Sequence, residues 1–265
     1  MNNTFDFNRF SLLVKRQWVE NKKLFLMASF GVAGILAILN ALIMTWESGI
    51  INEVARYVFF NLSLFLSGSI FANYVFKDIS DKNSSTSFLL IPASHFEKFL
   101  TGVLYTFILF PLVFLSLHYV VDFGFVSIGN NIKDDLKVLG VRNLQLYSYI
   151  FNNGDVRKEL DRTIGFWLVI QAFVLMGAAQ FEGRTYIKTA FMGFAILFLM
   201  GFVIYLSDKF LLGDIIKEFQ NKGYSRTLVK PTKDLFDSIL GIILIYVLPP
   251  ILLVVTYFKL KEKQV

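Results

Sequence analysis

The residue types that carry catalysis or hold metal ions are sparse in this chain. The sequence contains no Cys and only two His, His95 and His118. The absence of Cys excludes disulfides, thiolate metal sites and Cys nucleophiles. The two His do not form the H-E-x-x-H pattern of a zinc protease, and an ordinary hydrogen-bonded position near a membrane surface is the favoured role of each. We therefore expect no catalytic centre, no metal and no cofactor.

A nucleotide site is not expected either. The phosphate-binding pattern G-x-x-x-x-G-K-[ST] is missing, because no Gly in the sequence is followed directly by Lys. If ATP drives this protein, another chain binds the ATP.

Ion coupling is disfavoured by the composition of the apolar runs. Ion-coupled transporters usually carry charged residues within their membrane spans. Here Arg56 and Glu182 fall at the edges of apolar runs, and the polar residues inside the runs are amides. Bridging between helices is the favoured role of these amides. They are Asn40, Asn61, Asn73, Gln171 and Gln180.

The most specific spacing lies between Ser84 and Phe99. Ser94 and Glu97 have the S-x-x-E spacing of a capping box, which predicts a helix that begins just after Ser94. Pro92 ends any element before it, because the residue that precedes a proline avoids the α-helical conformation. The apolar segment Phe88–Ile91 must then lie on the membrane, pack on the chain's own helices, or dock a partner.

The composition predicts an all-α integral membrane protein. Of the 265 residues, 55% are hydrophobic and only 17% are charged, with a mean hydropathy of +0.58. Soluble domains carry about 25% charged residues, and runs of about 18 uncharged residues are typical of membrane-spanning helices. We predict one transmembrane domain, 1–265, without a linker. Its six predicted spans are 24–46, 55–76, 100–121, 165–181, 189–206 and 238–258. Kinks are expected at Pro111 and at Pro249–Pro250.

Residues 1–23 are predicted to form an amphipathic helix that lies in the membrane interface. Its apolar side chains recur at spacings of three and four, which is the period of one helix face. These predicted interfacial anchors are Phe7, Phe10, Val14 and Trp18.

Six spans place both termini on one side of the membrane, and the basic residues indicate which side. Five Lys and Arg precede the first span, whereas only Arg56 lies near its far end. The positive-inside tendency therefore predicts that both termini and the loop 77–99 are cytoplasmic. Two polar loops, 122–164 and 207–237, would face the exterior. The net charge of +6 then requires no nucleic-acid partner, because Lys and Arg accumulate where loops face the cytoplasm and anionic membrane lipid.

The order of these features is similar to that of ABC-2 type permease subunits, the membrane halves of ABC exporters. A basic amphipathic arm and two spans come first. A polar segment follows, and it ends in Leu90-Ile-Pro-Ala-Ser94 and Glu97-Lys98 as the third span begins. The predicted loop 122–164 is longer than this resemblance suggests.

The resemblance implies a multi-pass protein of the bacterial cytoplasmic membrane that is not itself an enzyme. It implies two protein partners, a separate ABC ATPase subunit and a second permease, either a copy or a paralogue. The arm would form an elbow helix, and the loop 77–99 would carry the coupling helix. The expected ATPase contacts are Ser87, Phe88, Leu89, Leu90, Pro92, Ser94, Phe96, Glu97 and Lys98. A non-transporting membrane scaffold and, less favoured, an ion-coupled secondary transporter remain alternatives.

Overall fold

The structure is a computed structural model that describes residues 5–46, 53–76, 91–135, 154–207 and 243–262. Every element within these ranges is a helix. The α-helices are α1 (Phe7–Trp46), α2 (Glu53–Val75), α5 (His95–Val103), α6 (Phe110–Asp135), α8 (Gly154–Gln180), α9 (Thr185–Ser207) and α12 (Leu248–Glu262); the π-helical turns are η1 (Leu104–Leu109) and η4 (Ile243–Val247).

Four helices in the described part of the chain are long and apolar enough to cross a membrane. They cover Phe7–Leu42, Arg56–Val75, His95–Gly129 and Arg162–Gln180. The predicted all-α, multi-span class is confirmed at this level, whereas the number six is not established. The fifth predicted span falls within α9, which is apolar along most of its length, and residues 238–242 of the sixth predicted span lie outside the described residues.

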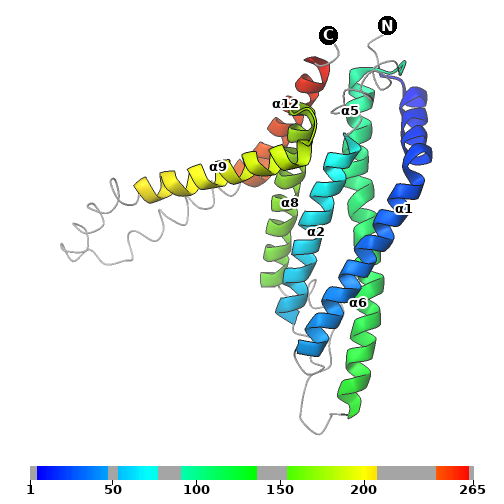
Figure 1. Cartoon of the computed structure of the whole chain (residues 1–265), viewed down its shortest axis with the longest axis vertical. Coiled ribbons are helices and arrows are strands. Elements are labelled where there is room, and N and C mark those ends of the chain that lie inside the picture. Colours follow the sequence, from blue (N-terminus) through cyan, green and yellow to red (C-terminus); the bar gives the residue numbers. More distant parts are fainter. Residues whose placement is uncertain (1–4, 47–52, 77–90, 136–153, 208–242, 263–265) are drawn as a thin grey trace, which may run out of the picture.

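The long helices lie side by side as a bundle, and both chain ends lie at the same end of it (Figure 1). We call this the terminal end. Gly183 and Arg184 have positive φ angles of 54° and 43°, a conformation that non-glycine residues rarely adopt, and they turn the chain sharply between α8 and α9. Figure 1 shows that α9 runs across the direction of the bundle, so it does not lie beside α8 as an antiparallel fifth span would.

The predicted arm and the first predicted span form one helix. α1 continues without a break from Phe7 to Trp46, and Figure 1 shows no right-angle turn that would set residues 7–23 apart as a separate helix. The prediction of a distinct N-terminal helix is therefore not confirmed. Helical periodicity simply continues from the amphipathic segment into the apolar one, and the chain contains no Gly or Pro at that junction to end the helix.

Prolines are accommodated by π-helical turns. Pro111 follows η1, where the Phe110 N–H bonds to the Tyr105 carbonyl five residues earlier. Pro249 and Pro250 follow a second π-helical turn, η4. A proline ring clashes with the carbonyl four residues before it and offers no N–H. Widening the preceding turn relieves this clash, so the predicted kinks take the form of two π-helical turns.

The boundaries predicted for the loop 122–164 were wrong. α6 continues to Asp135 and α8 already begins at Gly154; residues 136–153 lie outside the described residues. The prediction ended the span at the first charged residue. The helical alternation continues past that point, because Val126 is buried whereas Phe123 and Ile128 are exposed. The predicted loop 207–237 lies outside the described residues except for Ser207.

α2 and α8 approach each other closely at Gly68. The carbonyl of Gly68 accepts from the Gln171 amide nitrogen at 3.1 Å, and the Gln171 oxygen accepts from Trp167 Nε1 at 3.0 Å. A Cβ atom at position 68 would collide with the Gln171 side chain and would lie 3.1 Å from the Phe110 ring. Only a glycine leaves room for this buried amide between the two helices.

Replacing Gly68 by Ala is therefore expected to destabilise the bundle by about 1–3 kcal/mol, the usual cost of overpacking a core. The matched control is Gly31→Ala in α1, where an added Cβ would meet nothing within 4 Å. Thermal unfolding of both variants in the same detergent measures the difference. Equal melting temperatures for the two variants would contradict the close packing at Gly68.

Candidate functional site

The start of α5 is held by the predicted capping box, which is confirmed. The Ser94 hydroxyl accepts from the Glu97 N–H at 3.2 Å, and Glu97 Oε2 accepts from the Ser94 N–H at 2.8 Å. Both bonds satisfy backbone N–H groups that the first turn of a helix leaves unpaired. The helix that leads into the third span thus begins at the place that the S-x-x-E spacing indicates.

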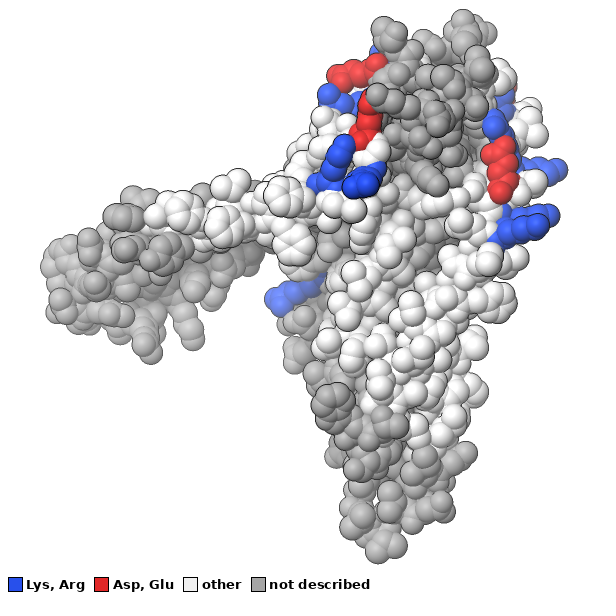
Figure 2. Space-filling view, in the orientation of Figure 1, with Lys and Arg blue, Asp and Glu red and all other residues white. Residues whose placement is uncertain are grey.

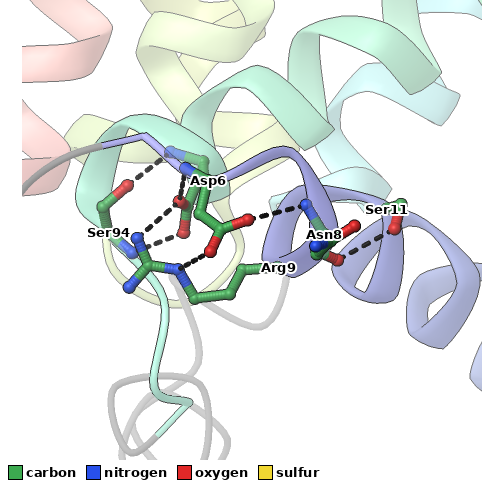
Figure 3. A network of polar contacts seen from close by, with 6 residues as sticks. Asp6, Asn8, Arg9, Ser11 and Ser94 are labelled. Atoms are coloured by element: carbon green, nitrogen blue, oxygen red, sulfur yellow. Dashed lines mark hydrogen bonds and ion pairs between the residues drawn. The ribbon is translucent and has the colours of Figure 1, made fainter.

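The second carboxylate oxygen of Glu97 binds the N-terminal arm (Figure 3). Glu97 Oε1 accepts from the Asp6 N–H at 2.8 Å and lies 3.2 Å from Arg9 Nη2. Asp6 in turn accepts from the Asn8 N–H at 2.8 Å through its own side chain, at the start of α1. The Glu97 side chain is fully buried, so one carboxylate joins the beginning of α1 to the beginning of α5. We call this contact the arm–α5 junction (Asp6, Arg9, Ser94 and Glu97).

Aromatic rings extend the arm–α5 junction to α12. Phe96 lies between Phe5 and Tyr257, at ring-centroid distances of 6.0 and 6.3 Å. Tyr257 also meets Phe99 at 5.7 Å. Edge-to-face contacts of this kind stabilise aromatic pairs. The first and last described helices therefore meet α5 at the terminal end of the bundle.

The arm packs on the bundle along one side. Tyr105 Oη donates to the Val14 carbonyl at 2.8 Å, and Tyr74 Oη donates to Asn21 Oδ1 at 2.8 Å. Leu13 is also buried. Two of the predicted anchors, Phe10 and Val14, are only partly exposed.

The other two predicted anchors face outward. Phe7 is 70% exposed and Trp18 is 49% exposed. The four predicted anchors therefore do not share one membrane-facing surface, because Val14 packs on the cluster of Val75 in α2 and Tyr105 in η1 instead of facing lipid.

The predicted ATPase contacts divide into three groups. Ser87, Phe88, Leu89 and Leu90 lie outside the described residues. Pro92 is exposed and Phe96 is 45% exposed, so both are open to a partner at the terminal end. Ser94 is partly exposed, whereas Glu97 and Lys98 are buried within the chain. These two residues can position the helix but offer little surface to another protein.

A second polar cluster lies inside the bundle, toward the end opposite the termini. Arg56 on α2 binds Asp122 on α6 through two hydrogen bonds, one of them 3.0 Å from Nε to Oδ1. The side chains are 14% and 1% exposed. His118, one turn before Asp122, is buried against the Phe60 ring at 4.8 Å. The next residue of α2, Tyr57, has its hydroxyl 2.7 Å from the Thr163 hydroxyl on α8.

This cluster corrects one sequence prediction, that Asp122 belongs to an exterior loop. Arg56 begins the apolar helix Arg56–Val75, at a span edge as predicted. Asp122 lies instead within the apolar helix His95–Gly129. A buried pair of charges needs this kind of two-point hydrogen bonding to offset the loss of water. No local pattern links the two residues, which are 66 positions apart.

The amides behave only in part as expected. Asn73 on α2 accepts from the Thr185 hydroxyl on α9 at 3.0 Å, and Gln171 bridges α8 to α2 as described above. Asn40 and Asn61 instead donate to carbonyls of their own helices. Gln180 is exposed. Bridging is thus confirmed for two of the amides.

Charged side chains gather at the terminal end, whereas the visible described surface along the rest of the helix bundle is largely uncharged (Figure 2). This distribution is typical of a protein whose bundle lies in lipid and whose charged end meets water. Among the described residues, no group of His, Cys, Asp or Glu is arranged to hold a metal ion.

Comparison of the chain with protein-family models, with curated proteins and with solved structures finds no match. A functional assignment therefore depends on the chain's own residues, above all on the arm–α5 junction and on the Arg56–Asp122 pair.

Proposed function

We propose that this chain is the transmembrane permease subunit of an ABC exporter and that a separate ATPase subunit supplies its energy. It would reside in the bacterial cytoplasmic membrane with both termini in the cytoplasm, paired with a second permease copy or a paralogue. The observation that carries the proposal is the arm–α5 junction. A capped helix begins there within the predicted loop 77–99, and Glu97 connects that helix to α1.

The arm–α5 junction suits a coupling role for a mechanical reason. A push on the segment before Ser94 acts on the first turn of α5, which continues through η1 into α6. Because Glu97 also holds Asp6 and Arg9, the same push acts on α1. ATP can shift the permease between two states only if the ATPase binds those states with different affinity. A junction that moves two spans together makes such a difference possible.

Apolar side chains would supply the affinity for the ATPase. Phe96 is 45% exposed at the terminal end, and Phe88 and Leu89 precede it in the sequence. Burial of each large apolar side chain contributes about 1.5–3 kcal/mol. A large apolar patch exposed on a water-facing surface is typical of a protein interface.

Replacing Phe88 and Leu89 together by Asp is expected to release the ATPase while the membrane domain stays folded. The measurement is purification of the native complex in mild detergent, followed by identification of the bound chains and assay of ATP hydrolysis. The matched control replaces Tyr186 and Ile187 by Asp, because these apolar side chains are also exposed but lie away from the junction. A folded Phe88/Leu89 variant that keeps its ATPase would contradict the coupling role of this loop. If no ATPase accompanies the native protein, the scaffold alternative is favoured.

The proposed orientation predicts which positions a membrane-impermeant reagent reaches. Single Cys residues can be introduced cleanly, because the chain has none. Ile150→Cys should react with an impermeant maleimide in intact cells or spheroplasts, and Ser85→Cys should react only after the membrane is opened. The reverse pattern would place the termini outside and would remove the loop 77–99 from the reach of a cytoplasmic ATPase.

Ion-coupled transport is the second candidate, because the structure shows a buried acid within an apolar helix. Asp122 with Arg56 and His118 is the type of intramembrane cluster that proton relays use. The two candidates differ in their energy source. Transport by reconstituted protein that depends on a proton or sodium gradient, without any ATPase, would favour this second function.

A further inference from the structure

The outward side of the arm combines basic and aromatic residues. Lys15, Arg16, Lys22 and Lys23 are all exposed, and Trp18 and Val19 stand among them at 49% and 54% exposure. We call these six residues the basic outer face of α1. The opposite side of the same helix is occupied, because Leu13 is buried and the Val14 carbonyl is bound by Tyr105.

The exposed surface of α1 changes character directly after Lys23. The next strongly exposed large side chains are all apolar: Leu24, Leu26, Met27 and Phe30. Since α1 is one continuous helix, this change marks where the helix enters hydrocarbon. Lys22 and Lys23 lie at this border, and Lys15 and Arg16 lie about 10 Å farther along the axis. Long basic side chains bridge such a distance by extending toward the headgroups.

The charge of the basic outer face indicates what covers it. It carries four basic residues, and the one acid among them, Glu20, is paired with Arg16 at 2.6 Å. The remaining positive charge favours an anionic surface, and the adjoining exposed indole is typical of headgroup depth.

We propose that the basic outer face binds the phosphate headgroups of anionic phospholipids, with Trp18 seated at the same depth. Lipid, not protein, is the occupant because the face continues without interruption into the apolar surface of a membrane span. This inference does not depend on the proposed transport function. It also places the four basic residues on a different side of the helix from Phe10 and Val14.

The test measures quenching of Trp18 fluorescence in the full chain. The chain has three Trp, so Trp46→Phe leaves Trp18 and the buried Trp167, and a Trp18→Phe variant supplies the background. The protein is reconstituted into phosphatidylcholine bilayers with a small fraction of brominated lipid, either phosphatidylglycerol or phosphatidylcholine. Brominated phosphatidylglycerol should quench Trp18 more strongly than brominated phosphatidylcholine at equal fractions.

The decisive variant replaces Lys15, Lys22 and Lys23 by Gln. Each basic residue near a membrane surface favours anionic lipid by roughly fivefold. We therefore expect the preference for phosphatidylglycerol to fall by about 10- to 100-fold, with allowance for non-additivity. The matched control replaces Lys259 and Lys261, two basic residues of α12, by Gln and should keep the preference.

Three outcomes would overturn the proposal. Equal quenching by the two brominated lipids in the parent protein would show a neutral interface only. An unchanged preference in the triple variant would place anionic lipid elsewhere. Absence of quenching by either lipid would show that another protein covers the face, as an acidic partner would.

Discussion

Replacing Asp122 by Asn is expected to lower the free energy of unfolding by about 3–5 kcal/mol, the cost of leaving a buried charge without its partner. Arg56 is only 14% exposed and donates two hydrogen bonds to this carboxylate. The neutral amide of Asn has only one acceptor oxygen, so it can accept only one of these two hydrogen bonds and does not neutralise the Arg56 charge. The measurement is thermal unfolding in detergent, together with the yield of folded protein.

The matched control is Glu20→Gln, which removes the acid of an exposed ion pair. Glu20 and Arg16 are 51% and 44% exposed, and water replaces the partner readily. A loss of about 1 kcal/mol or less is expected there. Equal stability of the Asp122 and Glu20 variants would contradict the burial of the Arg56–Asp122 pair.

A double variant separates structure from function at this pair. Arg56→Met combined with Asp122→Leu removes both charges, and such apolar replacements are often neutral or stabilising. A stable double variant that transports normally would show that the pair serves packing. A stable double variant without transport would show that the charges take part in the transport cycle, as the ion-coupled alternative requires.

Replacing Glu97 by Ala is expected to loosen both helix beginnings that this residue joins. The carboxylate accepts from Ser94 N–H and Asp6 N–H and pairs with Arg9. Hydrogen bonds to charged groups contribute about 1.5–3 kcal/mol each. The Arg9 side chain is one-third exposed, so water can replace its partner in the variant. With this exposure taken into account, we expect the free energy of unfolding to fall by about 2–4 kcal/mol in total.

Hydrogen exchange of backbone amides distinguishes the two functions of Glu97. Glu97→Ala should speed exchange at the start of α1 as well as at the start of α5. Ser94→Ala, the control, should cost about 0.5–2 kcal/mol and affect α5 alone, because Ser94 does not bond to the arm in the described contacts. Unchanged exchange around Asp6 in the Glu97 variant would show that the arm is held by its aromatic contacts instead.

The sequence by itself determined the features that depend on neighbouring residues. The capping box at Ser94 and Glu97 was predictable because its partners lie three positions apart and need no other helix. The apolar runs identified the long helices, since length and hydropathy suffice for that property. Prolines 111, 249 and 250 marked the places where regular helix geometry changes, because each lacks an N–H.

Only the tertiary structure decided which distant residues meet. Glu97 reaches Asp6 across 91 positions and Arg56 reaches Asp122 across 66, and no local pattern specifies either contact. Charge alone did not end the third long helix, because a charge can remain inside a helix when a partner on another helix neutralises it. The inward side of the arm was likewise unpredictable: a helical stripe shows that a face is apolar, whereas the neighbouring helices decide whether protein or lipid covers it.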